Sequence, residues 1–295
     1  MNELLNTEEA ADYLRLSERK LYDLVAQGAI PCTKATGRWL FPKTALDRWL
    51  AAGLITPAGL RSETRPPIVG GSQDPLLDWA LRDSGCGLAT LSEGSEAGLR
   101  RLARGEVMMA AIHLHRIDGD DETANTETVA QTPGLHDAVV IAFARREQGL
   151  LVAPGNPLKI TSLETAARLR VRVAQRQAGA GAQLLLLALL ARAGLQAGAL
   201  ALQEPPCPTG PDLGQAIRSG RADCGIASRS VAQGAGLEFV PLLWERFDLV
   251  LRQRDYFLPG PQAFFTYLRT AVFRGQAAEL RGYDVAQAGM VRLVN

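Results

Sequence analysis

The strongest constraint on the fold of this chain is the alternation of short strand-like and helix-like segments that starts at Ile68. Alternation of this kind predicts parallel sheets covered by helices. Two strand-like runs are much longer than the rest: "GLHDAVVIAFARREQGLLVAP" at 134–154 and "LEFVPLLWERFDLVLRQ" at 237–253. We therefore expect an α/β domain over residues 68–295 that two long crossing strands divide into two lobes.

The first 50 residues predict a separate compact unit. A helix over Glu8–Leu14 follows Thr7, and a second helix over Glu18–Gln27 follows Ser17; threonine and serine are favoured N-cap residues. Gly28 ends the second helix, as glycine commonly does. The segment "AIPCTKATGRWLF" predicts a β-hairpin, and "PKTALDRWL" predicts a third helix. Helix, turn, helix, hairpin, helix is the order of a small winged helix-turn-helix.

This unit resembles the excisionase-type and MerR-type DNA-binding domains over nearly its whole length, including the ending "GRWLFPKTALDRWL". The resemblance implies that the second helix enters the major groove and that the hairpin is a wing whose side chains hold phosphates. Residues 1–50 carry seven basic and seven acidic side chains, so binding requires that the basic ones share a face. A solvated surface on a protein-binding winged helix is the alternative. The predicted DNA-binding residues are Ser17, Glu18, Arg19, Lys20, Tyr22, Lys34, Thr36 and Arg38.

Residues 51–67, "AAGLITPAGLRSETRPP", predict a linker because Gly, Pro and Ser punctuate them. The rest of the chain, over about 68–290, resembles the periplasmic-binding-protein superfamily, with the molybdate-binding-like domains of cytoplasmic regulators as the nearest group. The resemblance rests on the order and spacing of pieces such as "GGSQDPLLDWAL", "GLLVAPGNPLKI" and "AIRSGRADCGIASRSVA". It implies a two-lobed, type II periplasmic-binding-protein-like sensing domain.

The turn "GAGAQ" at 179–183 lies where a short strand gives way to an apolar helix. The resembling family usually has "GSGTR" there, so two hydroxyls and a cation are missing and only backbone N–H donors remain for an oxyanion. The glycines either let bare backbone reach a ligand or form a tight turn packed under neighbouring elements. In an α/β domain of this kind we favour the ligand.

Ligands of open α/β sheets bind beyond the C-terminal ends of strands, near helix N-termini. Ser72 and Ser95 are also good N-caps, His113 could be a hydrogen-bonded core residue, and Arg176 could pair with a local carboxylate. We expect His115 and the polar loop "RIDGDDETANTE" to be solvated. The predicted ligand-binding residues are Ser72, Gln73, Gly94, Ser95, His113, Arg176, Gln177, Gly179, Ala180, Gly181, Thr209 and Ser228.

Composition and known motifs limit the classes of function that this chain can have. Lys plus Arg is 32 and Asp plus Glu is 31, so overall charge indicates neither a nucleic-acid nor a membrane partner. The four cysteines lie far apart without a CxxC pair, which predicts free thiols. The chain has three histidines and no cluster of Cys and His ligands, which predicts no metal site. We find no nucleophile elbow, HExxH or Walker A motif, which argues against an enzyme or a bound cofactor. The N-terminus lacks a secretory pattern, so we expect a cytoplasmic protein.

Together these features predict a one-component transcription regulator. A homodimer is expected, because a unit this small neutralises few phosphates and two half-sites would strengthen binding. The resemblance implies an oxyanion effector such as molybdate or tungstate, or a molybdenum-cofactor-related molecule. The alternatives are a cytoplasmic solute-binding protein, or an enzyme whose winged helix docks a protein.

Overall fold

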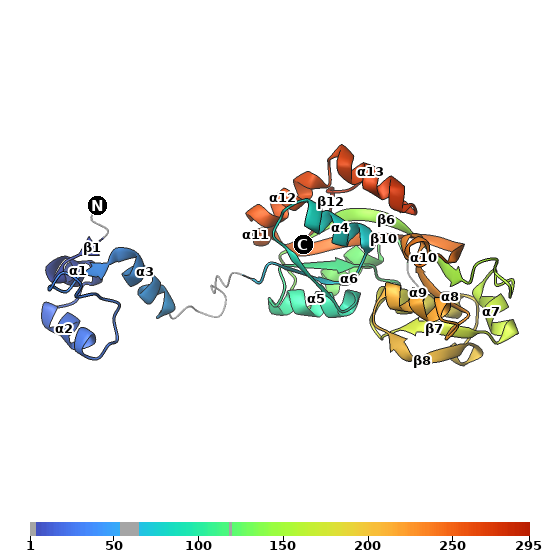
Figure 1. The fold of residues 1–295 in the computed structure, drawn as a ribbon, viewed down its shortest axis with the longest axis horizontal. Coiled ribbons are helices and arrows are strands. Elements are labelled where there is room, and N and C mark those ends of the chain that lie inside the picture. The colour runs from blue at the N-terminus through green and yellow to red at the C-terminus, as the bar shows by residue number, and fades with distance from the viewer. Residues whose placement is uncertain (1–3, 54–64, 118–119) are drawn as a thin grey trace. The chain divides into compact units, whose positions relative to one another are not determined.

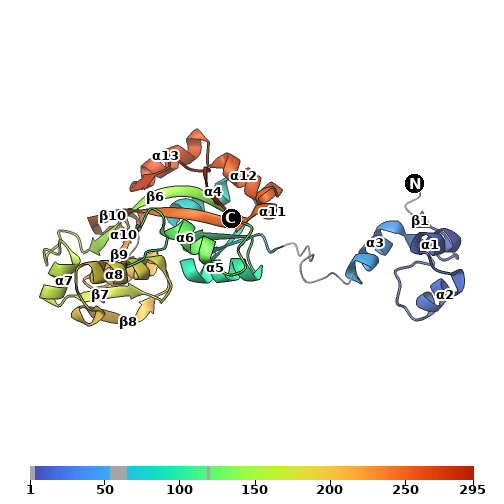
Figure 2. The ribbon, with the colours of Figure 1, turned by 180° about the vertical axis from the view of Figure 1, so that it is seen from behind.

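The computed structural model describes residues 4–53, 65–117 and 120–295. The chain divides into two compact units, Met1–Thr64 and Arg65–Asn295 (Figures 1 and 2). Most of the predicted linker, 54–64, lies outside the described residues. Its last part does not behave as a linker: Arg65 is buried in the second unit, where its guanidinium pairs with Asp255. Among the described helices, none has the length and apolarity needed to cross a membrane.

The N-terminal unit contains the three predicted helices around a small apolar core. The first helix is capped by Asn6 rather than Thr7, because Asn6 accepts a hydrogen bond from the Glu9 N–H while the Glu9 carboxylate accepts one from the Asn6 N–H. Ser17 caps the second helix as predicted. The core is formed by Ala10, Ala11, Leu21, Ile30, Phe41 and Leu46. The elements are β1 (Leu4–Leu5), α1 (Thr7–Leu14), α2 (Glu18–Ala26), β2 (Phe41–Pro42) and α3 (Lys43–Ala52).

The predicted wing hairpin is reduced to one bridge between Thr33 and Leu40, and β2 pairs with β1 instead. Each residue of this bridge donates a backbone hydrogen bond to the other. In the same register the next such pair is Pro31 with Pro42, and neither has an N–H to donate. The ladder therefore stops after one rung, and the segment that follows pairs with the N-terminal strand.

The C-terminal unit contains the predicted alternation of strands and helices. Its strands are β3 (Ile68–Gly71), β4 (Ala89–Ser92), β5 (Met109–Ile112), β6 (Ala138–Val152), β7 (Arg172–Arg176), β8 (Ala201–Cys207), β9 (Cys224–Ser228), β10 (Glu238–Arg252), β11 (Tyr283–Asp284) and β12 (Val291–Val294). Its helices are α4 (Pro75–Asp83), α5 (Ser95–Arg104), α6 (Ala124–Gln131), α7 (Leu163–Leu169), α8 (Gly181–Arg192), η1 (Ala197–Ala199), α9 (Gly210–Arg218), α10 (Arg229–Ala235), α11 (Gln253–Tyr256), α12 (Pro259–Tyr267) and α13 (Ala271–Leu280).

The strands form one ten-stranded sheet in the order β4-β3-β5-β10-β6-β9-β7-β8, with β11 and β12 against β6. The long strands β6 and β10 are antiparallel and pair along their whole length. One end of the pair joins β5 and β12 in the first lobe, and the other end joins β9 in the second lobe. Between them lies the crossing segment, residues 145–148 of β6 and 244–246 of β10. The two predicted long strands therefore do connect two lobes.

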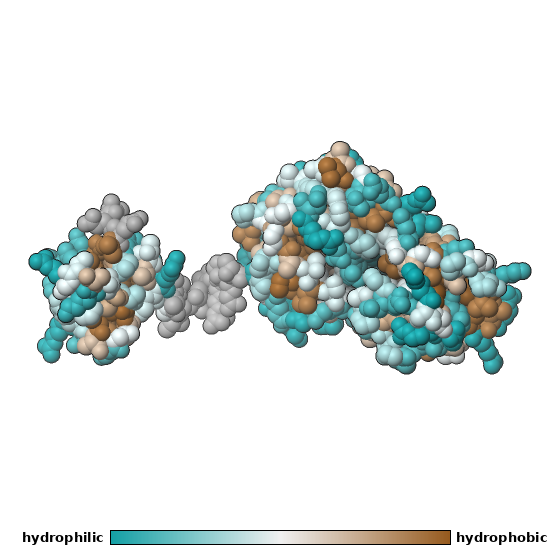
Figure 3. Space-filling view, in the orientation of Figure 1, coloured by the Kyte–Doolittle hydropathy of each residue, from teal (hydrophilic) through white to brown (hydrophobic). Residues whose placement is uncertain are grey.

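Each lobe has its own core. In the first lobe α4, α12 and α13 cover one face of the sheet and α5 and α6 the other (Figure 1). Phe143 contacts Phe247, Phe264 and Phe273 at the centre of the first face. The second lobe packs leucines of α8 against β6, β7 and β9. Figure 3 shows mainly hydrophilic residues on the visible surface, with hydrophobic ones in small groups.

The expectation about the polar loop needs correction. The loop "RIDGDDETANTE" is not wholly solvated: α6 begins at Ala124, and Ala124 and Asn125 are buried. Asn125 is held there because its side chain accepts from the Leu114 N–H and donates to Asp248.

Candidate functional site

A small cavity lies between the two lobes, beside the crossing segment. Its water-accessible space is about 30 Å³, enough for roughly two water molecules. The cavity brings together four of the predicted ligand-binding residues, Gln73, His113, Arg176 and Ser228, which lie at or just beyond the ends of four different strands. The other lining residues are Pro75, Arg146, Gln148, Ala182, Gly210, Pro211, Ala227 and Val231.

Arg146 at the crossing segment is a residue that sequence reasoning missed. It stands directly opposite Glu245 in the β6–β10 ladder, and its Nε lies 2.9 Å from a Glu245 carboxylate oxygen. Its Nη1 lies 2.8 Å from Asp74 of the first lobe, and its guanidinium sits over the Phe247 ring. The available signal was a pair of charged stretches, "ARREQ" and "WERF", inside otherwise apolar strands. These buried charges fix the two long strands to each other and to the first lobe.

His113 and His115 both contact Glu245. They lie two residues apart in the chain, and both rings lie on the same side because they reach the same carboxylate. The Glu245 Oε2 atom is 3.0 Å from His113 Nδ1 and 2.8 Å from His115 Nε2. The expectation that His115 is exposed is wrong: it is buried, and its Nδ1 lies 3.1 Å from Asp121 of the supposedly solvated loop. The signal was the "HLH" spacing, but the carboxylate partner lies 130 residues away.

The two histidines differ in protonation. Burial lowers the pKa of His113 to about 4, so its ring is neutral at physiological pH. Burial alone would also lower the pKa of His115, but hydrogen bonds to Asp121 and Glu245 raise it to about 9. Burial would raise the pKa of Glu245, yet the surrounding His113, Arg146 and His115 hold it well below its usual value. Glu245 is therefore an ionised acceptor, and His115 is a cation between two carboxylates.

The ligand atoms of His113, His115 and Glu245 all lie within 4.8 Å of one another, so this cluster could hold a metal ion. We expected no such cluster. The charges are already balanced, because Arg146, His115 and Arg192 face Asp74, Glu245 and Asp121. A divalent ion would have to displace the His115 proton and would add charge to a balanced network. Hydrogen bonds and ion pairs therefore account for the cluster.

Arg176, at the end of β7, is the cation of the cavity without a counter-charge. Its Nε donates to the Cys207 carbonyl at 2.9 Å and its Nη2 to the Pro208 carbonyl at 2.7 Å. No carboxylate of the described residues lies within ion-pair distance of Arg176. The alternative that Arg176 pairs with a local carboxylate is therefore wrong, and backbone carbonyls hold the side chain. Burial lowers the pKa of Arg176 to about 10, and the side chain remains charged at physiological pH.

The glycine turn before α8 packs against the first lobe. A methyl group on Gly181 would come within 2.2 Å of the His113 carbonyl oxygen, and one on Gly179 within 2.7 Å of the Glu96 carboxylate. A methyl group on Gly94 would meet Ala180 at 3.0 Å. Gly94, Gly179, Ala180 and Gly181 are therefore brought together as a contact between the lobes, not as part of the cavity lining. Here the tight, packed turn is the better description.

The remaining predicted ligand-binding residues have local roles. Ser72 and Ser95 are not N-caps: Asp74 caps α4 and Gly94 precedes α5. The Ser95 hydroxyl instead lies 2.8 Å from that of Ser72 and bridges to the backbone of His113. Two more residues remain. Thr209 caps α9 together with Asp212, and Gln177 lies outside the cavity lining with a buried Oε1 that has no partner.

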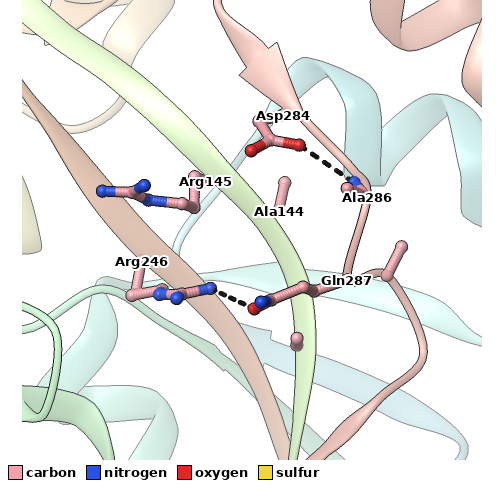
Figure 4. A pocket seen from close by; sticks show the side chains of 8 residues that line it. Ala144, Arg145, Arg246, Asp284, Ala286 and Gln287 are labelled. Atoms are coloured by element: carbon pink, nitrogen blue, oxygen red, sulfur yellow. Dashed lines mark hydrogen bonds between the residues drawn. The ribbon is translucent and has the colours of Figure 1, made fainter.

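A second pocket, of about 110 Å³, lies over the crossing segment next to β11 (Figure 4). Arg246 donates there to Gln287 at 2.7 Å, and Arg145 pairs with Glu122. Since Arg145 and Arg246 neighbour Arg146 and Glu245 along their strands, they point to the opposite face of the sheet. The cations of this pocket already have protein partners, which distinguishes it from the cavity that contains Arg176.

The predicted DNA-binding residues lie together on helix α2 and on the loop before β2. Ser17, the cap of α2, is exposed, as are Glu18, Arg19, Lys20 and Tyr22. Lys34, Thr36 and Arg38 are also exposed, and the Lys34 ammonium lies 5.2 Å above the Trp39 ring. The inner side of the helix is fixed by Leu21, which is fully buried. This leaves a polar, partly basic helix surface available to a partner.

Comparison with known proteins agrees with this architecture. A PBP superfamily domain matches residues 78–269, and a helix-turn-helix domain matches residues 4–53. An uncharacterised protein of Bacillus subtilis, YvgK, is 23% identical over 97% of this chain and 96% of its own length. Among solved structures, the tungstate ABC transporter of Geobacter sulfurreducens covers 72% of this chain and 98% of its own, at 13% identity and a TM-score of 0.51. PhnD1 of Prochlorococcus marinus in complex with methylphosphonate covers 75% of this chain and 93% of its own, at 13% identity and a TM-score of 0.53.

Proposed function

The chain belongs to the PBP superfamily and carries an N-terminal helix-turn-helix domain, and we propose that it is a transcription regulator that binds DNA and senses a small anion. The observation that supports an anionic ligand is Arg176, a half-buried cation that lines the interlobe cavity and has only backbone carbonyls as hydrogen-bond partners among the described residues. A buried charge without a counter-charge is costly, so an anion in the cavity would gain a strong, charge-assisted hydrogen bond.

The DNA-binding side of the proposal rests on helix α2. In helix-turn-helix proteins the exposed N-terminal part of the second helix reads base edges, and neighbouring basic side chains hold phosphates. Arg19 and Lys20 lie in the first turn of α2, and Lys34 and Arg38 lie on the following loop. Because these few cations neutralise few phosphates, we propose a homodimer on two half-sites.

The proposed signal is the state of the two lobes. An anion that contacts both Arg176 of the second lobe and residues of the first lobe favours a closed arrangement. This arrangement regulates DNA binding only if the ligand has different affinity for the DNA-bound and DNA-free protein. The effector we propose is a small anion, and the family resemblance suggests molybdate, tungstate or a molybdenum-cofactor-related molecule as the first candidates to test. The names of the two similar solved structures, a tungstate transporter and a methylphosphonate complex, support the anion class.

We also propose that the protein works in the cytoplasm, where regulators meet DNA, and that it is not an enzyme. In support of the second point, the carboxylates beside the cavity are held by cations and hydrogen-bond donors of the protein. Glu245 accepts from both histidines and from Arg146, and Asp74 accepts from Arg146 and caps α4. A general acid or base needs a free proton position that faces a substrate.

A DNA-binding experiment tests the function. Sites would be selected from a random duplex pool with the full chain, and affinity measured by fluorescence anisotropy at several salt concentrations. Arg19→Ala should weaken selected-site binding by about 1–3 kcal/mol if Arg19 reads a base. Arg168→Ala, an exposed arginine of the second lobe, is the control with the same loss of charge and should bind normally. Failure to select any sequence would reject the regulator in favour of a protein-docking unit.

A further inference from the structure

The cavity between the lobes has an unusual balance of hydrogen-bonding groups. Its charged donor, Arg176, uses Nε and Nη2 on backbone carbonyls. Its second guanidinium, that of Arg146, is already bound to Asp74 and Glu245. One cation is thus available to a ligand, and the other polar groups of the lining determine what else the ligand must offer.

Two of those groups are amide oxygens without a partner. Gln148 is 2% exposed, and its Nε2 donates to Glu245 at 2.7 Å, so its Oε1 is left buried with no hydrogen bond from the described residues. Gln73 shows the same arrangement: its Nε2 donates to Asp78 at 3.3 Å, and its buried Oε1 is unpaired. Both carboxylates can only accept, which fixes each amide with its NH₂ toward the carboxylate. The unpaired atoms are therefore acceptors.

His113 adds a third acceptor to the lining. Because Glu245 is ionised, the hydrogen bond at 3.0 Å must be donated by His113 Nδ1. A neutral ring that carries its proton on Nδ1 has a lone pair on Nε2. Among the residues that line the cavity, Gln73, Gln148 and His113 thus carry acceptors without a partner in the described part of the chain, and Arg176 carries a positive charge.

We infer that the anion bound in this cavity carries at least one O–H or N–H donor, as a protonated oxyanion or a hydroxy acid does. This inference rests on the proposed function, because it defines the ligand chemistry of the same cavity. A fully deprotonated tetraoxyanion such as molybdate, tungstate or sulfate has only acceptors, so it would face the amide oxygens with like charge and leave them unpaired. A site that contains buried groups for a ligand donor strongly rejects an analogue that lacks it.

The test compares matched ligands by isothermal titration calorimetry of the full chain at slightly acidic pH. Inorganic phosphate and sulfate share a shape but only phosphate keeps protons, and glycolate and acetate differ by one hydroxyl. Molybdate and tungstate are further ligands without donors. We expect phosphate, glycolate or both to bind roughly 10- to 100-fold more tightly than their partners. The pair that shows the difference tells a protonated oxyanion from a hydroxy acid.

Variants separate the inference from the proposed function. Gln73→Met removes an acceptor and should reduce the preference, and Gln148→Met provides an independent check. Gln177→Met is the matched control, because its unpaired amide oxygen lies outside the cavity lining. Equal binding of all the anions, with loss in Arg176→Gln, would overturn the inference and leave the anion sensor standing. No binding of any probe would overturn both.

Discussion

At the residue scale, the most informative side chains are His113 and His115. They share one carboxylate and one side of the chain, yet they carry different charges, because His115 has a second carboxylate, Asp121, and His113 has none. Buried histidines with opposite protonation states make stability depend on pH in both directions. This behaviour identifies the network in solution without any ligand.

His115→Gln should remove an alkaline loss of stability. The pKa of His115 is raised from 6.5 to about 9 in the folded chain, so its contribution is complete below pH 6.5 and disappears as the pH rises through 9. Over this window the native protein should lose about 2 kcal/mol of unfolding free energy that the variant does not lose. Urea unfolding between pH 6.5 and 9 measures this difference.

The matched control for this prediction is His136→Gln, because His136 is exposed and keeps the His115 network intact. Two other groups change stability outside this pH window. His113, whose pKa is about 4, reduces stability as the pH falls below 6.5. Cys224, whose pKa burial raises to about 12, reduces stability only as the pH rises above 9. Identical slopes for native protein and His115→Gln would show that His115 is not a buried cation.

At the scale of elements, helix ends and strand ladders follow from a few local groups. The short helix α1 depends on a reciprocal pair of hydrogen bonds between Asn6 and Glu9. The ladder of the predicted wing ends after one bridge, because Pro31 and Pro42 stand where the next hydrogen-bonded pair would be and have no N–H to donate. The edge strand β8 contains Pro205 and Pro206, which hinder further strand addition at that edge.

Asn6→Ala should weaken α1, because it removes the side-chain oxygen that satisfies an N-terminal N–H. The loss is about 1 kcal/mol, within the usual range for N-caps. Hydrogen–deuterium exchange of residues 7–14 in the full chain should become roughly fivefold faster. Thr7→Ala tests the alternative cap that the sequence suggested, and it should change exchange much less. A larger effect for Thr7→Ala would restore Thr7 as the cap.

At the scale of the whole sensing unit, the lobes meet along backbone that only small residues allow. Gly181 faces the carbonyl and ring of His113, and Gly94 faces Ala180 from the other side of the contact. The crossing segment joins the lobes through buried ion pairs, and this contact closes them over the cavity. A ligand that enters the cavity must therefore either fit the closed space or separate this contact.

Gly181→Ala should destabilise the closed unit. The added methyl group would lie 2.2 Å from the His113 carbonyl oxygen and 2.4 Å from its ring, so the lobes or the backbone must shift. Overpacking of this kind costs about 1–3 kcal/mol, which thermal or urea unfolding detects. Gly234→Ala is the control: it adds the same methyl group in helix α10, where nothing lies within 4 Å. Equal stability of the two variants would mean that the lobes do not touch at Gly181 in solution.

The sequence by itself determined the two-unit architecture, the two long strands and the exposed surface of helix α2. These features depend on apolar period, caps and turn residues that lie within a few positions of each other, as with Ser17 before α2. The position of Gln73, His113, Arg176 and Ser228 at strand ends was equally local, which is why the sequence placed them near one cavity.

Only the tertiary structure decided how the buried charges are paired and which residues pack against the glycine turn. His115 meets Glu245 across 130 positions of sequence, and Arg146 meets Asp74 across 72. No local pattern encodes such partners, because they depend on which strands become neighbours and on the register between them. For the same reason the sequence could not show that His113 occupies the space beside Gly181, or that Arg176 lacks a carboxylate.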